Sequence, residues 1–304
     1  MSQYVLSSHL QTFRTTPHFN HYVPAEQTVT PIPTTCRWSL HQISTYRWSL
    51  AEDVVQYRKA GIPAIGLWLK KVRETGEDQT VELISASGLS VSSLSWLGGF
   101  TGTEGLTHIE ALDEAVDAIQ LAGRLSAQTV VVVSGARGYH IQSHARRCTR
   151  SALIRLGDAA AEAGLMVTLL PESRPLSRPW SIFRDWEAAL DVVVGCDHPH
   201  VKLALDIERF RPGLLPTAQL NDIVPYLSHM QISRITATTA DTQLLQAGSE
   251  PDSLAEDIAA LQHAGFSGYC EYEMWTEATW QSRYEDWLDT LSTGWSVVSH
   301  SVNR

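Results

Sequence analysis

The stretch VTLLPESRP, residues 167–175, is an apolar run that ends abruptly in a proline, a carboxylate and a guanidinium. Short apolar runs bounded by turn residues are typical of strands buried on both faces of a parallel sheet. Polar side chains directly after such a strand lie at its carboxyl end, where α/β folds carry their active sites. The function therefore depends on how many such strands the chain has, and on whether Glu172 serves as a metal ligand and catalytic base.

Eight β-type runs of this kind alternate with longer segments of helical period, which predicts βα units around a parallel sheet. Several helical segments start with Ser or Thr followed by an acidic residue and stop at Gly, as capped helices do. The expected strands are residues 38–44, 64–69, 89–96, 129–135, 166–170, 201–206, 230–235 and 268–275. The expected helices are residues 49–61, 80–88, 108–125, 143–164, 181–194, 217–227, 253–265 and 284–295.

Eight strand–helix pairs with no break between halves favour an α/β fold that is a closed (β/α)8 TIM barrel, here a single domain over residues 36–304. No GxGxxG follows the first run, which removes the main reason to expect an open dinucleotide-binding sheet. Residues 1–35 are polar, rich in His and Thr, and end in the punctuated TVTPIPTT. They are expected to form an irregular N-terminal arm.

Composition excludes several classes of function. The net charge of −10 argues against nucleic acid and anionic membranes as partners, because both need clustered cations. The sequence contains no apolar run long enough for a spanning helix and no secretory signal pattern. Four widely spaced cysteines without a CxxC motif indicate reduced thiols and a cytoplasmic location; they are Cys36, Cys148, Cys196 and Cys270.

Three carboxylate positions converge on the carboxyl end of the predicted barrel: Glu172, Asp206 and Glu273. Carboxylates mixed with amide or imidazole groups suit Mn²⁺ or Mg²⁺, and Zn²⁺ or Co²⁺ can also fit. Such an ion could clamp two sugar oxygens and polarise a carbonyl while a carboxylate moves a proton. Trp68, Trp96 and Trp275 would supply flat walls for the C–H face of a sugar, whereas Trp180 and Trp280 are expected to pack against the barrel.

The order and spacing of these motifs resemble the xylose isomerase-like barrel family, in particular its sugar phosphate isomerase/epimerase branch. The resemblance covers most of residues 38–292 and is carried by residues 41–68, 118–135, VKLALDIERF (201–210), HMQIS (229–233) and GFSGYCEYEMW (265–275). It implies a divalent metal held by a Glu, an Asp, a His and a final Glu at the last four strand ends. The two Glu residues also act as the acid–base pair through an enediolate. Self-association is common in the family.

Carried over by position, this pattern assigns catalysis to Glu172 and Glu273, and assigns metal binding to these two residues with Asp206 and Gln231. Three departures stand out. The family's Glu-Pro pair appears as Pro171-Glu172, and a slip of one residue reverses the facing of a strand side chain. The His of the family's D-x-x-H stretch is Arg209. The His expected on the seventh strand is Gln231, a weaker neutral ligand, with His229 two residues earlier on the same face.

Simpler structural interpretations compete with each functional one. For Glu172 the competing interpretation is an ion pair with Arg174. Glu271 competes with Glu273 because both lie on one face of the last run. His140 suits a surface histidine and His229 a core histidine. Arg209 could either neutralise the carboxylates at the carboxyl end of the barrel or bind a phosphate. Lys70 and Lys71 are expected to be solvated.

The sequence therefore predicts a divalent-metal-dependent sugar or sugar-phosphate isomerase or epimerase of carbohydrate metabolism. The expected substrate contacts are His140, Arg174, Arg209, Trp68, Trp96 and His229. Two alternatives remain open. One is a lyase or dehydratase that acts on an inosose or 3-keto sugar at the same site. The other is a degenerate barrel that binds a sugar-like ligand or a partner without catalysis.

Overall fold

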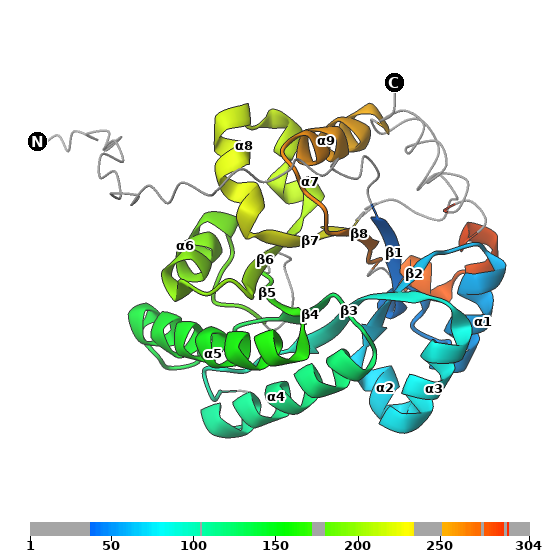
Figure 1. Cartoon of the computed structure of the whole chain (residues 1–304), viewed down its shortest axis with the longest axis horizontal. Coiled ribbons are helices and arrows are strands. Elements are labelled where there is room, and N and C mark those ends of the chain that lie inside the picture. The colour runs from blue at the N-terminus through cyan, green and yellow to red at the C-terminus, as the bar shows by residue number, and fades with distance from the viewer. Residues whose placement is uncertain are drawn as a thin grey trace, which may run out of the picture. The chain divides into compact units, whose positions relative to one another are not determined.

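The computed structural model describes residues 37–103, 105–171, 180–233, 251–274, 277–288 and 291. Eight parallel strands close into a barrel in sequence order, and the closing pair joins the first strand to the last (Figure 1). The predicted (β/α)8 barrel is confirmed, while the predicted arm, residues 1–35, lies outside the described residues. The strands are β1 (Arg37–His41), β2 (Ala64–Trp68), β3 (Ser90–Leu97), β4 (Thr129–Val132), β5 (Met166–Leu169), β6 (Val201–Asp206), β7 (Leu227–Ile232) and β8 (Tyr269–Tyr272).

Helices surround the strands on the outside of the barrel (Figure 1). Seven of the eight predicted helical segments are found, and only part of the eighth is described, with residues 284–288 helical. The helices are α1 (Leu50–Lys59), α2 (Leu69–Thr75), α3 (Glu77–Ser87), α4 (His108–Arg124), α5 (Gln142–Ala163), α6 (Trp186–Cys196), α7 (Ile207–Phe210), α8 (Thr217–Ile223), α9 (Pro251–His263) and α10 (Glu277–Gln281). Short 3-10 turns are η1 (Gln42–Thr45), η2 (Pro212–Leu214) and η3 (Val224–Tyr226).

Local sequence explains where the principal helices begin and end. Ser49 and Glu52 form a capping box at the start of α1, and Thr107 and Glu110 form another at the start of α4. Helix α5 ends at Gly164, whose φ of 72° satisfies the left-handed C-cap that a glycine adopts without strain. In the part of the chain that the structure describes, no helix is long and apolar enough to cross a membrane.

The largest cluster of buried apolar side chains lies between strands and helices, with Leu40, Leu67 and Leu94 among its fully buried members. A second, small apolar cluster consists of Val131, Val133, Leu170 and Ala204, against which Trp96 and Trp180 pack. Strand β7 begins at Leu227, three residues before the predicted start at Met230. The prediction began too late because Ser228 and His229 are polar and interrupt the apolar run. Both are buried, and Ser228 Oγ lies 2.7 Å from Thr168 Oγ1 on β5.

Candidate functional site

Three of the four predicted metal ligands lie on neighbouring strands at the carboxyl end of the barrel. Asp206 ends β6 and is paired in register with Gln231 on β7. Glu273 directly follows β8, and its backbone N–H donates to the carbonyl of Ile232 at 3.2 Å. Gln231 Nε2 donates to Glu273 Oε2 at 2.5 Å, and the hydroxyl of Ser233 donates to Asp206 Oδ2. We call Asp206, Gln231 and Glu273 the oxygen trio.

The members of the oxygen trio differ in burial. Gln231 and Glu273 are 3% and 1% exposed, whereas Asp206 is half-buried. The fourth predicted ligand, Glu172, lies outside the described residues, as do Arg174 and Trp275. Pro171 is described and half-buried, and it follows Leu170, a member of the small apolar cluster. The roles assigned to Glu172 and Arg174 therefore stay predictions.

Glu271 occupies a deeper position than Glu273 and has a different environment. Its carboxylate is 1% exposed and accepts hydrogen bonds from the hydroxyls of Ser39 at 3.0 Å, Ser93 at 3.0 Å, and Ser92. His229 Nε2 lies 3.2 Å from Glu271 Oε1. Both oxygens of this carboxylate are thus engaged within the protein.

Electrostatics explain how Glu271 tolerates complete burial. Burial by itself raises the pKa of Glu271, but the close approach of His229, the attraction of His41 and the hydrogen bond from Ser92 more than offset it. The pKa of Glu271 consequently falls to about 2, and the group is ionised at neutral pH. Gly66 on β2 makes room for it, since a Cβ there would lie 2.3 Å from Glu271 Oε2.

The two histidines nearest this carboxylate have no exposed surface. His229, predicted as a substrate contact, is 0% exposed, and no hydrogen-bond partner of its Nδ1 is found among the described residues. His41, which the sequence did not single out, accepts the N–H of Ile43 at Nδ1 (3.1 Å), so its proton lies on Nε2 and is donated to Ser95 Oγ at 2.6 Å. Its ring lies 4.6 Å from that of Trp96.

Aromatic side chains form a second feature at the same end of the barrel. Trp68 ends β2 and Trp96 lies near the end of β3, with ring centroids 6.5 Å apart. Tyr46 contacts Trp68 at 5.8 Å and Trp280 at 5.1 Å, and Trp96 contacts Trp180 at 5.7 Å. Trp180 and Trp280 thus join a chain of rings, which the sequence did not predict because the rings come from elements far apart along the chain.

A pocket of about 380 Å³ lies beside these rings. Its lining consists of Trp68, Leu69, Lys70, Arg73, Glu74 and Trp96. All of them come from the end of β2, from helix α2 along its length and from the end of β3, so the pocket opens at the carboxyl end of the barrel. We call it the β2–β3 pocket. Trp68 and Trp96 were predicted as substrate walls, and both line it.

Two further predicted substrate contacts, Arg209 and His140, lie among the described residues. Arg209 is exposed on the short helix α7. His140 follows β4, and its Nε2 donates to the carbonyl of Thr101 at 2.9 Å, while its ring packs on His144 at 4.8 Å. The side chain of His140 is therefore already engaged with the backbone. Their roles as substrate contacts stay predictions.

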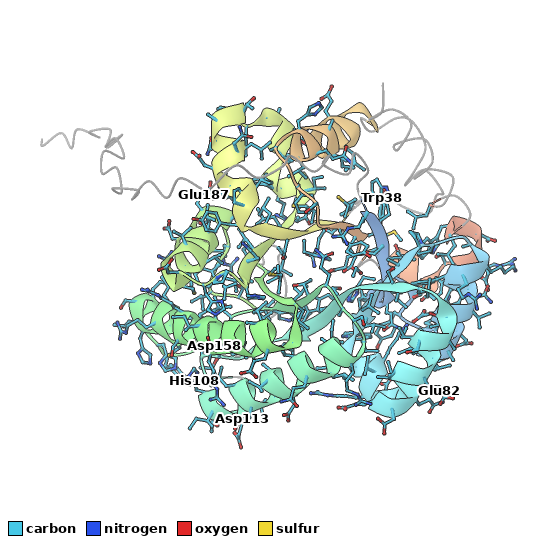
Figure 2. The ribbon with its side chains drawn as sticks, in the orientation of Figure 1. Trp38, Glu82, His108, Asp113, Asp158 and Glu187 are labelled. Carbon is cyan, nitrogen blue, oxygen red and sulfur yellow. The ribbon has the colours of Figure 1, made fainter. Side chains whose placement is uncertain are left out.

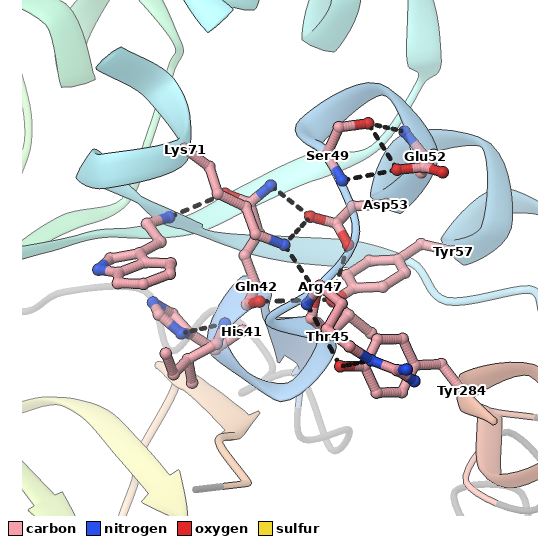
Figure 3. Close-up of polar contacts among 12 residues, drawn as sticks. His41, Gln42, Thr45, Arg47, Ser49, Glu52, Asp53, Tyr57, Lys71 and Tyr284 are labelled. Atoms are coloured by element: carbon pink, nitrogen blue, oxygen red, sulfur yellow. Dashed lines mark hydrogen bonds and ion pairs between the residues drawn. The ribbon is translucent and has the colours of Figure 1, made fainter. Parts of the chain in front are cut away.

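The expectation that Lys71 is solvated is wrong. Lys71 is 3% exposed and its Nζ lies 2.7 Å from Asp53 Oδ2 and 2.9 Å from the carbonyl of Thr45 (Figure 3). The physical reason is that Asp53 of α1 turns inward and supplies the counter-charge. Burial raises the pKa of Asp53 to about 7 and lowers the pKa of Lys71. Lys70, by contrast, has a half-exposed side chain, as expected.

The chemistry of the oxygen trio fits a hard divalent cation in kind, because two carboxylates and one amide all offer oxygen atoms. Within the described residues, no three His, Cys, Asp or Glu side chains gather closely enough to hold a metal. Gln231 is not one of those four residue types, and Glu172 is not among the described residues. Among the described cysteines, Cys148 and Cys196 are free thiols.

Comparison with known proteins agrees with this architecture. The family described as "Xylose isomerase-like TIM barrel" matches residues 54–293. Protein SMc04130 from Sinorhizobium meliloti 1021 has a similar structure, with a TM-score of 0.73 and 22% identity over 86% of this chain and 98% of that one. No curated protein gives a significant match.

Two further solved structures carry informative names. The IOLI protein with a bound zinc atom has a TM-score of 0.69 and 16% identity over 88% of this chain and 99% of that one. The 3-keto-D-glucoside 4-epimerase YcjR from E. coli has a TM-score of 0.65 and 16% identity over 86% of this chain and all 100% of that one. At these identities, the likeness establishes the fold.

Proposed function

The chain belongs to the xylose isomerase-like TIM barrel family, and from this premise we propose that it is a divalent-metal-dependent sugar or sugar-phosphate isomerase or epimerase. The observation that carries the proposal is the oxygen trio on β6, β7 and β8, at the end of the barrel where such enzymes act. A bound zinc atom in one solved structure of this fold and the name of an epimerase on another support it.

Asp206, Gln231 and Glu273 would hold the cation through oxygen atoms, with Glu172 as the fourth ligand. When bound, the cation would polarise the sugar carbonyl and hold a neighbouring hydroxyl oxygen.

The residues of this chain would carry the proton. The Glu273 carboxylate would take it from the carbon next to the carbonyl, and Glu172 would deliver a proton back to the same or the adjacent carbon. Gln231 Nε2 donates to Glu273 Oε2 at 2.5 Å and would orient this carboxylate. Deep burial around Glu273 excludes water from the transfer.

One observation favours a second function, a barrel that binds a sugar-like ligand without metal or turnover. Gln231 directs its amide nitrogen, not its oxygen, at Glu273. A glutamine in that orientation satisfies the carboxylate in place of a cation, so the same contact is what a site that has lost its metal would show.

Metal titration with thermal unfolding separates the two functions. For the metal-dependent enzyme, Mn²⁺ raises the Tm of the wild-type protein, and Glu273→Gln removes that rise together with turnover. Gln231→His should strengthen Mn²⁺ binding about tenfold or more, because imidazole replaces a weak neutral ligand. Glu162→Gln, an exposed change on α5, is the matched control and should behave as wild type.

Turnover is measured as exchange of the C–H next to the carbonyl in D₂O across a panel of ketoses, aldoses and their phosphates. A wild-type protein that shows neither a Tm shift with Mn²⁺, Mg²⁺, Zn²⁺ or Co²⁺ nor such exchange contradicts the enzyme. If Gln231→His alone then gains a Tm shift with metal, the barrel is a metal site lost by substitution, and the second function holds.

A further inference from the structure

We propose that the β2–β3 pocket binds a second, uncharged sugar ring, so that the substrate is a glycoside of at least two rings and not a monosaccharide phosphate. This inference rests on the proposed function, which places the reacting sugar at the oxygen trio. The volume of about 380 Å³ falls within the range of about 300–1,000 Å³ found for small-molecule sites.

The walls of the pocket suit the C–H face of a ring. Trp68 and Trp96 present partly exposed indoles whose centroids lie 6.5 Å apart, and Tyr46 and Trp280 extend the aromatic surface beyond Trp68. Rigid aromatic side chains supply large contact area at a low cost in conformational entropy. A flat ligand with one apolar face is what such a surface recognises.

The charges of the lining argue against an anionic occupant. Lys70 Nζ lies 3.8 Å from Glu74 Oε1 and also sits over the rings of Tyr46 and Trp68, at 5.3 and 5.0 Å. Arg73 is paired with Glu114. Each cation of the pocket therefore has a carboxylate partner with which a phosphate would compete. Paired charges of this kind offer both donors and acceptors to neutral hydroxyl groups.

A buried polar network holds the wall in place before any ligand arrives (Figure 3). Gln42 Oε1 accepts the backbone N–H of Trp68 at 2.9 Å, and Gln42 Nε2 donates to Asp53 Oδ2 at 2.8 Å. Asp53 in turn is paired with Lys71 and accepts the hydroxyl of Thr45 at 2.6 Å. The network thus fixes the position of the Trp68 backbone. A wall that is already ordered lowers the entropic cost of binding.

The position of the pocket requires a ligand longer than one ring. In the closed strand order, β2 and β3 lie on the opposite side of the barrel from β6 and β7. Eight strands spaced about 4.8 Å apart and tilted by about 36° give a barrel about 15 Å across. Asp206 ends β6 and Gln231 lies on β7, so a ring stacked on Trp68 lies across the barrel from these two residues, and one ligand that reaches both walls must contain two rings.

The test is ligand-observed NMR with cellobiose, maltose and gentiobiose, in EDTA, so that binding is measured without metal or turnover. We expect at least one disaccharide to bind the wild-type protein and Trp68→Phe with similar affinity. Trp68→Ala should bind it about fivefold more weakly or worse, as expected for the loss of an aromatic contact. Tyr139→Ala removes a fully exposed ring from the loop after β4 and is the matched control. Far-UV circular dichroism confirms that each variant is folded.

Glucose 6-phosphate serves as the competitor. If it displaces the disaccharide at lower concentration than glucose does, the pocket prefers an anion and the inference is overturned. Absence of binding by all three disaccharides, or equal binding by wild type and Trp68→Ala, overturns it as well. Mn²⁺-dependent turnover of a monosaccharide without disaccharide binding contradicts this inference alone. Disaccharide binding without any metal response contradicts the proposed function alone.

Discussion

At the scale of single residues, burial separates side chains that look equivalent in the sequence. Glu271 and Glu273 both lie on the inner face of the last strand, yet Glu271 is held by three serines and His229 while Glu273 meets Gln231. Lys70 and Lys71 are adjacent, yet one is half-exposed and the other is in a buried ion pair. In each pair, the neighbour across the barrel or from another helix decides the role.

The buried pair of Asp53 and Lys71 leads to a prediction about stability. Asp53→Asn or Lys71→Met alone should lower the free energy of unfolding by about 3–5 kcal/mol, because each leaves the other charge buried and unpaired. The double variant should lose clearly less than the sum of the two. Urea unfolding of all four proteins measures the coupling.

An exposed ion pair provides the control for that cycle. Asp113 projects from α4 at the outside of the barrel (Figure 2), and it lies 2.8 Å from Arg155 with about half of each side chain exposed. Asp113→Asn should therefore cost about 1 kcal/mol or less. If Asp53→Asn costs no more than Asp113→Asn, the buried network does not hold the turn that carries Trp68.

At the scale of elements, one local sequence is used twice. SLAED occurs at residues 49–53 and 253–257. In α1 its aspartate, Asp53, binds η1 by accepting the hydroxyl of Thr45. In α9 the corresponding Asp257 binds η2 by accepting the N–H of Gly213 at 2.7 Å. The helix starts differ, because α1 begins after the Ser49 cap whereas α9 begins at Pro251. The helical period was predictable from the sequence, but the anchoring role of the aspartate was not.

The capping box of α4 gives a prediction at this scale. Thr107→Ala removes the hydroxyl that accepts the N–H of Glu110 at 3.2 Å and should lower the free energy of unfolding by about 1 kcal/mol. Thr217→Ala is the control, since Thr217 is exposed in the first turn of α8 and Pro216 provides no side-chain cap. Chemical denaturation of both variants measures the difference, and equal losses would contradict a stabilising role for the box.

At the scale of the whole molecule, closure of the barrel joins the two ends of the folded chain. Strand β1 pairs with β8 from Arg37 and Tyr269 to Leu40 and Tyr272. We call this β1–β8 pairing the seam. The guanidinium of Arg37 strengthens it by donating to the carbonyl of Ser267 and to Gln128 Oε1. A closed sheet has no free edge, so neither strand has an unpaired side from which opening could start.

Hydrogen exchange tests this consequence of closure. Backbone amides of β1 and β8 should exchange as slowly as those of β4 and β5, because all four strands open only in the global transition. Amides of the short exposed helix α8 are the internal comparison and should exchange much faster. Fast exchange confined to β1 and β8 would show that the seam opens separately and that closure contributes little to stability.

The sequence by itself determined the strand and helix order, the barrel, the family and the placement of Asp206, Gln231 and Glu273 at neighbouring strand ends. These follow from short apolar runs, helical periodicity and cap residues, all of which act over a few neighbouring positions. Tertiary structure decided that Glu271 is an internal charge, that Lys71 is buried, and that rings from Tyr46 to Trp180 gather at one end. The physical reason is that burial and pairing depend on strand register and on distant partners. No short stretch of sequence encodes either.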